Sequence, residues 1–141
     1  MKFGSAAFIL NADRHVLLVK HSYGALNWEL PGGASEADES PVDTALRETR
    51  EETGLQVVAR HLTGIYHDSS TDLLHFVFWC EPQESEMNPM PDRQEITECR
   101  FWPPDALPRP ISDWTVRRIE DALSGVTGPL PTRIGPRQWL E

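Results

Sequence analysis

The sequence contains only two cysteines, no long apolar run and fewer basic than acidic residues. Cys80 and Cys99 form neither a CxxC pair nor a disulfide framework, so we expect a reduced, cytoplasmic setting and no structural zinc. The most apolar stretch, Leu73 to Cys80, has eight residues and includes a histidine, far short of the roughly 20 that a transmembrane helix needs. The apolar run that ends at Leu10 is too short, and too soon followed by polar residues, to predict a signal peptide.

The charge balance excludes two classes of partner. The 141 residues include 13 Lys and Arg but 22 Asp and Glu, a formal net charge of −9. A surface of this sign does not suit the coating of a nucleic-acid polymer or adsorption to an anionic membrane. Hydrophobic residues at 39% and charged residues at 25% are ordinary for a folded domain. We therefore expect a single domain over 1–141, with an extended Pro/Gly-rich tail at about 126–141.

Patterns of apolar residues and turns predict the order of the elements. A polar turn between apolar runs at 3–10 and 15–22 predicts a β-hairpin, and Pro-Gly-Gly at the end of 23–33 predicts a loop. Further strands are expected at 55–66, 73–81 and 95–102, with an exposed, mobile loop at 82–94 and a second helix at 111–124. Strands around one helix, with a late second helix, indicate an α/β (α+β) layered domain.

The segment 41–54 is the clearest helix. Ser40 suits an N-cap, Pro41 suits a first turn, and Gly54 suits a C-terminal stop. One face carries small or apolar residues that can dock on a sheet: Val42, Ala45, Leu46 and Thr49.

Three glutamates share another side of this helix. Glu48, Glu51 and Glu52 stand at positions i, i+3 and i+4, so their carboxylates are expected to project together. Clustered like charges are costly unless a cation lies among them, and carboxylate oxygens suit Mg²⁺ or Mn²⁺. The alternative is a solvated acidic face on which Arg47 pairs with Glu51.

The wider spacing around the helix resembles the signature of the Nudix hydrolase family, in its MutT-like form. The matching positions are Gly33, Glu39, Arg47, Glu48, Glu51, Glu52, Gly54 and Leu55. Thr49 departs from the pattern, since an aliphatic residue is usual there. The resemblance implies an α/β/α sandwich with a mixed central sheet. It also implies metal-dependent hydrolysis, with Mg²⁺ or Mn²⁺, of a nucleoside diphosphate linked to another moiety.

The resemblance also suggests roles for individual residues. Glu48, Glu51 and Glu52 are expected as metal ligands, and Arg47 as the partner that orients a glutamate. Glu51 and Arg47 are expected among the catalytic residues. The general base is either Glu52 or Glu95, and Glu95 lies where the predicted loop at 82–94 meets the strand at 95–102. The residues expected to bind substrate are Lys20, Trp28, Gly32 and Gly33. Further candidates are Tyr23 and Tyr66, which could bind the nucleobase, and His21 and Arg50, which could bind phosphate. His75, inside an apolar strand, is expected to be a core histidine with its hydrogen bonds satisfied.

Several alternatives remain open at this level. The expected substrate is a nucleoside di- or triphosphate; ADP-ribose or a nucleotide sugar is the alternative within the family. A non-catalytic, nucleotide-sensing module is the alternative of another class. The tail at 128–141 could anchor a protein partner through Trp139 and Leu140, pack on its own domain, or cover the partner in a homodimer.

Overall fold

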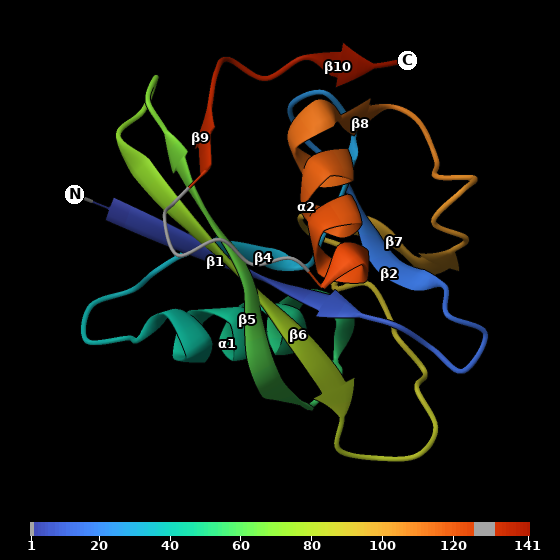
Figure 1. Cartoon of the computed structure of the whole chain (residues 1–141). Coiled ribbons are helices and arrows are strands. Elements are labelled where there is room, and N and C mark those ends of the chain that lie inside the picture. The colour runs from blue at the N-terminus through green and yellow to red at the C-terminus, as the bar shows by residue number, and fades with distance from the viewer. Residues whose placement is uncertain (1, 126–131) are drawn as a thin grey trace.

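Two mixed β-sheets and two helices make up the part of the chain that the computed structural model describes, residues 2–125 and 132–141 (Figure 1). The first sheet has the strand order β4 (Gly32–Ala34), β1 (Lys2–Ile9), β6 (Leu73–Pro82), β5 (Val57–Asp68) and β9 (Thr132–Ile134). The second has the order β10 (Trp139–Leu140), β8 (Ile111–Ser112), β3 (Trp28–Glu29), β2 (Val16–His21) and β7 (Ile96–Trp102). The helices are α1 (Pro41–Thr53) and α2 (Asp113–Ser124).

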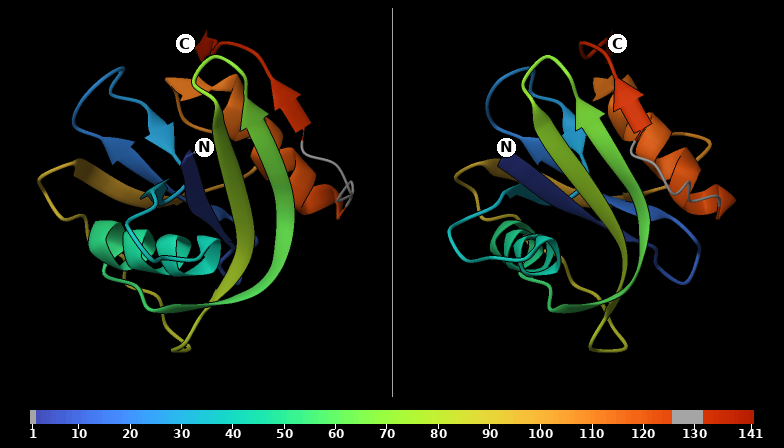
Figure 2. Two further views of the ribbon diagram at one scale, coloured as in Figure 1. Left: turned by 90° about the vertical axis from the view of Figure 1, so that its left-hand side faces the viewer. Right: turned by 60° about the vertical axis from the view of Figure 1, so that its left-hand side comes forward.

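The strand β1, inside the first sheet, has a helix on each of its faces. Ala6 and Phe8 belong to one core cluster, which includes Ile119 of α2. Ala7 belongs to a second cluster, which includes Ala45 of α1. Because successive side chains of a strand point to opposite faces, the two helices cover opposite sides of the sheet, as Figure 2 shows. The expected α/β/α sandwich is confirmed. Its strands form two sheets, and each sheet contains both parallel and antiparallel pairs.

The hairpin predicted for the first two strands is wrong. β1 pairs with β4 and β6, whereas β2 pairs with β3 and β7, and a single bridge between Leu10 and Val16 joins their near ends. Both strands are fully buried along most of their length, so each needs neighbours on both edges and cover on both faces. The polar turn is present, but the chain uses it to pass from one sheet to the other.

The loop predicted at 23–33 is also only partly present. It contains β3 and the first residues of β4, which flank Pro31. The carbonyl of Pro31 accepts a hydrogen bond of 2.9 Å from the N–H of Ala7, so this bend is held against β1. The two short strands thereby bring Gly32 and Gly33 to the edge of the first sheet, beside α1.

The ends of α1 agree with the sequence prediction to within a residue. Ser40 Oγ accepts from the Asp43 N–H at 3.1 Å, and Asp43 Oδ2 accepts from the Ser40 N–H at 3.2 Å, a reciprocal capping box. Gly54 closes the helix in a left-handed conformation with φ of 75° and donates to the Arg50 carbonyl at 2.8 Å. These caps fix the rotation of α1 and hence the direction of its glutamates.

The second helix begins two residues later than predicted, because Ile111 and Ser112 form β8 and Ser112 serves as the N-cap. The described part of the tail, 132–141, is extended as expected, in β9 and β10; the rest of the predicted tail, 126–131, lies outside the described residues. Neither described helix has the length and apolar character to span a membrane.

Candidate active site

The strand β4 lies close to β1 at Gly32 and close to the Glu48 side chain of α1 at Gly33. The Gly32 N–H donates to Glu52 Oε1 at 2.8 Å. A Cβ on Gly33 would lie 2.7 Å from Oε1 of Glu48, and a Cβ on Gly32 would lie 2.4 Å from the Ser5 carbonyl oxygen. The lack of a side chain on Gly33 therefore leaves room for the carboxylate of Glu48 against the backbone of β4, and glycine at 32 allows the close approach to β1.

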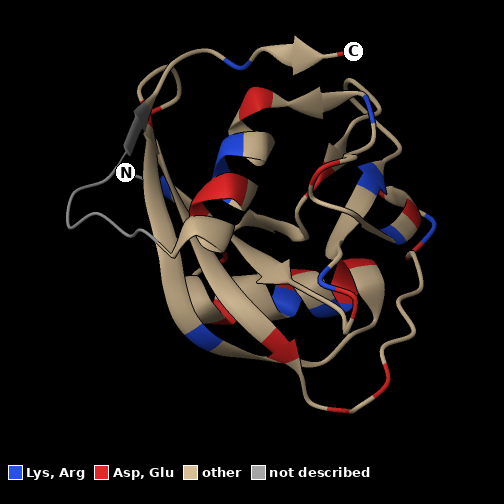
Figure 3. Cartoon of the chain, turned by 45° about the vertical axis from the view of Figure 1, so that its right-hand side comes forward, with Lys and Arg blue, Asp and Glu red and all other residues tan. Residues whose placement is uncertain are grey.

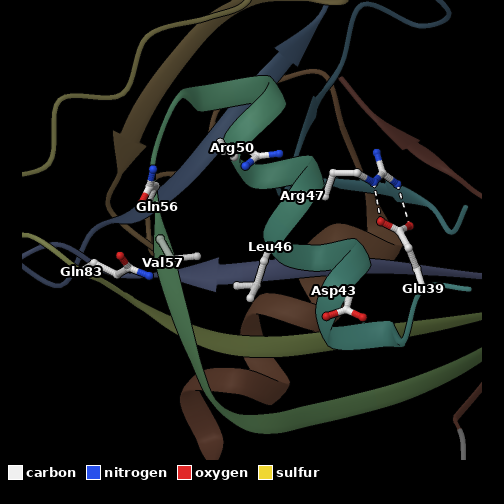
Figure 4. A pocket seen from close by; sticks show the side chains of 8 residues that line it. All are labelled: Glu39, Asp43, Leu46, Arg47, Arg50, Gln56, Val57 and Gln83. Atoms are coloured by element: carbon white, nitrogen blue, oxygen red, sulfur yellow. Dashed lines mark hydrogen bonds and ion pairs between the residues drawn. The ribbon is translucent and has the colours of Figure 1, made fainter.

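Arg47 forms hydrogen bonds with three carboxylates, those of Glu39, Glu48 and Glu51. Its Nε and Nη2 donate to the two oxygens of Glu39 at 2.6 and 3.0 Å, a bidentate pair visible in Figure 4. Its Nη1 donates to Glu48 Oε1 at 3.0 Å and to Glu51 Oε2 at 3.1 Å. Hydrogen bonds from Arg47 lower the pKa of Glu39 to about 2. Arg47 thus holds Glu48 and Glu51 in fixed orientations, in keeping with the orienting role that the resemblance implied.

Glu52 has no ion pair with Arg47, and the ion pair of Glu48 offsets its burial only in part. Burial raises the pKa of Glu52 to about 8; the bond from Gly32 opposes this rise, and the negative charges of Glu48 and Asp92 add to it. Burial likewise raises the pKa of Glu48, although Arg47 opposes the shift. A cation bound between these groups would favour their charged forms, because an opposite charge nearby stabilises a carboxylate.

The donor set fits a hard divalent cation in its chemistry. Glu48, Glu51 and Glu52 offer only carboxylate oxygens, the ligands that Mg²⁺ and Mn²⁺ prefer. The three do not project together as expected: Glu52 is 3% exposed under β4, whereas the Glu51 side chain is 51% exposed and bonded to Arg47. In residues 2–125 and 132–141, no group of three or more His, Cys, Asp or Glu side chains is placed to hold a metal ion.

Glu95 lies at the end of the loop before β7, and its charge contributes to the raised pKa of Glu48. Asp92 shapes this loop, since its Oδ1 accepts from the backbone N–H of Glu95 at 3.2 Å and of Ile96 at 3.0 Å. The Glu95 carbonyl accepts from the Ser22 N–H at 2.8 Å, which ties the loop to the end of β2. The structure therefore brings Glu95 near the glutamates of α1 through an element distant in sequence.

The other expected substrate-binding residues separate into two groups. Trp28 is buried in the core, and Lys20 Nζ lies 6.0 Å from the centre of its ring. Tyr66 is buried as well, with its hydroxyl donating to Asp121 Oδ2 at 2.7 Å. By contrast, Tyr23 and Gly33 line a cavity of about 210 Å³ that opens beside the glutamates.

Sequence reasoning missed two residues of this cavity. Glu29 of β3 accepts hydrogen bonds from Arg118 and Thr115 of α2, and the Arg118 and Glu29 side chains are 7% and 13% exposed. The available signal was the position of Arg118, four residues after Trp114 and beside Ile119, on the apolar stripe of α2. A charged residue on a buried stripe indicates a buried partner.

The prediction for His75 is wrong. Its Nε2 is buried without a hydrogen-bond partner, and the ring lies edge-on to Trp114 with centroids 5.8 Å apart. Burial is the main reason that the pKa of His75 is lowered to about 4, so the imidazole is neutral at pH 7. His75 lines the same cavity as Gly33.

A larger cavity of about 460 Å³ lies on the outer side of α1, and Figure 4 shows the side chains that line it. It contains Arg47 and Glu39, which are already bonded to each other. Neither cavity is lined by Glu48, Glu51 or Glu52, but Gly32 and Gly33, which line the smaller one, lie against Glu52 and Glu48. Acidic and basic residues stand close together on both helices, as Figure 3 shows. The cavity of about 210 Å³, next to Glu48 and Glu52, is therefore the better candidate for substrate.

The comparisons with known proteins agree with this geometry. The family model described as the NUDIX domain matches residues 2–122, so the chain belongs to the Nudix hydrolase family. It is thus an enzyme of the pyrophosphohydrolase class, for which the family implies nucleotide-type substrates and, typically, dependence on a divalent metal.

The chain is also similar to individual proteins and to solved structures. The chain is 32% identical over 124 residues to a MutT-like protein of Streptomyces ambofaciens, covering 88% of this chain and 77% of that one. It is 29% identical over 122 residues to a Bacillus subtilis (strain 168) protein provisionally named 8-oxo-dGTP diphosphatase, covering 86% and 80%. A NUDIX hydrolase structure from Nitrosomonas europaea superposes with a TM-score of 0.76 at 22% identity, over 96% of this chain and 79% of that chain. This last likeness shows the fold alone.

Proposed function

We propose that this enzyme hydrolyses a nucleoside di- or triphosphate and releases a nucleoside monophosphate, in a reaction that requires Mg²⁺ or Mn²⁺. The observation that carries the proposal is the position of Glu52. Its carboxylate is buried beside Glu48, is bonded to the Gly32 N–H at 2.8 Å, and lies next to a cavity of about 210 Å³. A buried carboxylate without an ion pair, next to a second carboxylate, is costly in free energy, and a bound cation would offset that cost.

In this proposal Glu48, Glu51 and Glu52 hold the metal. A cation bound there would offset the charge of the diphosphate beside these carboxylates and would lower the pKa of a bound water. Arg47 positions Glu48 and Glu51 through its Nη1 hydrogen bonds. Glu52 or Glu95 accepts the proton from the attacking water.

The size of the cavity supports a compact substrate. Cavities that enclose drug-sized ligands measure roughly 300 to 1,000 Å³, so about 210 Å³ suits a single ring system with the phosphates outside. The name of the Bacillus subtilis relative, which refers to a nucleoside triphosphate, supports the same class. ADP-ribose and nucleotide sugars, which carry a second sugar beyond the diphosphate, are the alternatives within the family.

The first experiment is a substrate panel. The purified protein is incubated with nucleoside di- and triphosphates, ADP-ribose and nucleotide sugars, with Mg²⁺, with Mn²⁺ and with a chelator, and the products are separated. We expect metal-dependent release of a nucleoside monophosphate, fastest from a nucleoside di- or triphosphate. Faster cleavage of ADP-ribose or a nucleotide sugar would refute the substrate class. Absence of any turnover in a folded, metal-binding sample would favour the sensing module.

A substitution tests the site itself. Glu52→Gln should lower turnover about 100-fold or more, because it removes the charge that a ligand or a base requires. Glu120→Gln, an exposed glutamate on α2, makes the same chemical change away from the cavity and should leave turnover unaltered. Nearly normal turnover in Glu52→Gln would rule out this assignment of the site.

A further inference from the structure

The last described segment, 132–141, follows the region that the family model matches and joins both sheets of the domain. β9 pairs with β5 of the first sheet, and β10 pairs with β8 of the second. Between these strands the Asp113 N–H donates to the Gln138 carbonyl at 3.1 Å, and the Gln138 N–H donates back to Asp113 Oδ1 at 3.0 Å. The segment is thereby fixed against its own domain, and Arg137 is placed on the wall of the cavity of about 210 Å³.

Arg137 lies against two indole rings and has a hydrogen-bond donor without a partner. Its guanidinium carbon lies 4.5 Å from the ring centre of Trp114 and 5.5 Å from that of Trp139. The aromatic rings stabilise the charge and restrict the plane of the guanidinium. Its Nε is buried and makes no hydrogen bond. A guanidinium has donors and no acceptor, so whatever completes this group must offer an acceptor.

Two other residues that line the same cavity also have a polar atom without a hydrogen-bond partner. Ser5 Oγ of β1 and His75 Nε2 of β6 are buried without hydrogen-bond partners. The acid of the cavity, Glu29, is already bonded to Arg118, so it does not satisfy Arg137. Unsatisfied buried polar atoms are rare, and three that line one cavity, from three separate elements, indicate a ligand that completes them.

The rim of the cavity favours a flat ring over a phosphate chain. Tyr23 and His21 both line it and stack on each other, with ring centres 4.7 Å apart and planes 10° apart. Tyr23 is 52% exposed, so its outer side offers an aromatic surface to a ligand. Leu30 and Leu73 add apolar surface to the lining. Burial raises the pKa of Tyr23 and the charges of Glu52 and Glu48 add to the rise, so a base stacked on Tyr23 would leave its phosphates at Gly33, beside these glutamates.

We propose that Arg137 is a specificity-determining residue that donates to the carbonyl oxygen of a keto-type nucleobase and selects it over an amino-type base. Guanine offers O6 and N7 as adjacent acceptors, and thymine offers O4, which match the guanidinium donors. Adenine and cytosine carry an amino group at the equivalent position, so donor would face donor. The inference rests on the proposed function, because it assigns the base of the same substrate.

The test compares bases of equal size. kcat/KM is measured with Mg²⁺ for dGTP against dATP and for dTTP against dCTP, in the wild type and in Arg137→Met. We expect the wild type to prefer the keto member of each pair by about tenfold or more, the discrimination that a good arginine–base contact provides. Arg137→Met should abolish this preference through a loss on the keto member. Arg137→Lys, which keeps the charge but not the fork, should lower it as well.

The matched control is Arg100→Met. Arg100 also lies over an indole ring, 5.0 Å from the centre of Trp102, but it belongs to β7, and no part of it lines the cavity. Its substitution should leave both keto-to-amino ratios unchanged. Thermal melting of each variant identifies a loss of folding; should Arg137→Met fail to fold, Arg137→Lys carries the comparison.

A binding assay separates this inference from the proposed function. Trp114 and Trp139 flank Arg137, so tryptophan fluorescence reports a ligand there. GMP should change the emission and AMP should not, and Arg137→Met should remove the difference. Selective, Arg137-dependent binding of GMP without hydrolysis of any nucleotide would uphold the inference and refute the proposed function. An equal loss for all four triphosphates would place Arg137 on the phosphates and overturn the inference, as would a wild type without keto preference.

Discussion

The ion pair between Glu29 of β3 and Arg118 of α2 joins the second sheet to the helix that covers it. The two side chains are 13% and 7% exposed, and Glu29 Oε1 also accepts from the Leu30 N–H at 2.9 Å and from Thr115 Oγ1 at 2.7 Å. Glu29→Gln removes the negative charge and leaves the guanidinium of Arg118 buried. Breaking a buried pair in this way costs about 3–5 kcal/mol, a large part of the stability of a typical domain.

The effect of Glu29→Gln also depends on pH. Burial pushes the pKa of Glu29 upward, but the charges of Arg118 and Arg137 and the bond from Thr115 outweigh it, so this pKa lies below its ordinary value. A carboxyl with a lowered pKa in the folded state stabilises the protein above the unfolded pKa, about 4.5, and loses that contribution as the pH falls through the folded value. The difference between wild type and variant should therefore be full at pH 7 and smaller at pH 3.

Urea unfolding at both pH values measures this difference. At pH 7 we expect Glu29→Gln to lower the free energy of unfolding by about 3–5 kcal/mol, and adding Arg118→Met to recover part of the loss because no charge is then left unpaired. Glu81→Gln is the control: it breaks the Arg60–Glu81 pair, whose side chains are about half exposed, and should cost under about 1 kcal/mol. A cost below about 1 kcal/mol for Glu29→Gln at pH 7, or one that is no smaller at pH 3, would refute the reasoning.

Two further substitutions probe α1 and its neighbour β4. Thr49 is fully buried and its hydroxyl has no hydrogen-bond partner, so Thr49→Val should raise the free energy of unfolding by about 1 kcal/mol; a lower urea midpoint would contradict this. Gly33→Ala would place a Cβ 2.7 Å from Glu48 Oε1 and push that carboxylate aside, so metal affinity and turnover should fall about tenfold or more. Gly135→Ala, where a Cβ would meet no atom within 4 Å, is the matched control for Gly33→Ala.

Features governed by local chemistry were predictable from the sequence. The capping box at Ser40 and the left-handed stop at Gly54 follow from residue types within one turn of the helix, and both are present. Glu39, a position of the family signature just before α1, is bonded to Arg47, Thr44 and the Glu36 N–H, all within eight residues of it. These contacts join residues close in the sequence, so the capping residues and the apolar spacing were enough to predict the helix and its ends.

Features governed by distant contacts were not predictable in this way. A turn between two apolar runs has the same sequence whether the strands pair with each other or separate into two sheets; only the full burial of both faces decides it. The burial of Trp28, the unpartnered nitrogen of His75 and the position of Arg137 at the cavity depend on elements that are far apart in the sequence. Glu52 and Glu51 differ in exposure for the same reason, since β4 covers one of them.

The way that residues 132–141 are attached has a consequence for how the molecule can diversify. Both of its strands are joined to the domain by main-chain ladders, to β5 and to β8, and such ladders tolerate exchange of most side chains. The carboxylates of α1 lie on other elements and do not depend on the side chains of this segment for their orientation. If Arg137 selects the base as proposed, substitutions around it would alter which nucleotide is chosen and leave the carboxylates of α1 in place, so that selectivity could evolve separately from chemistry.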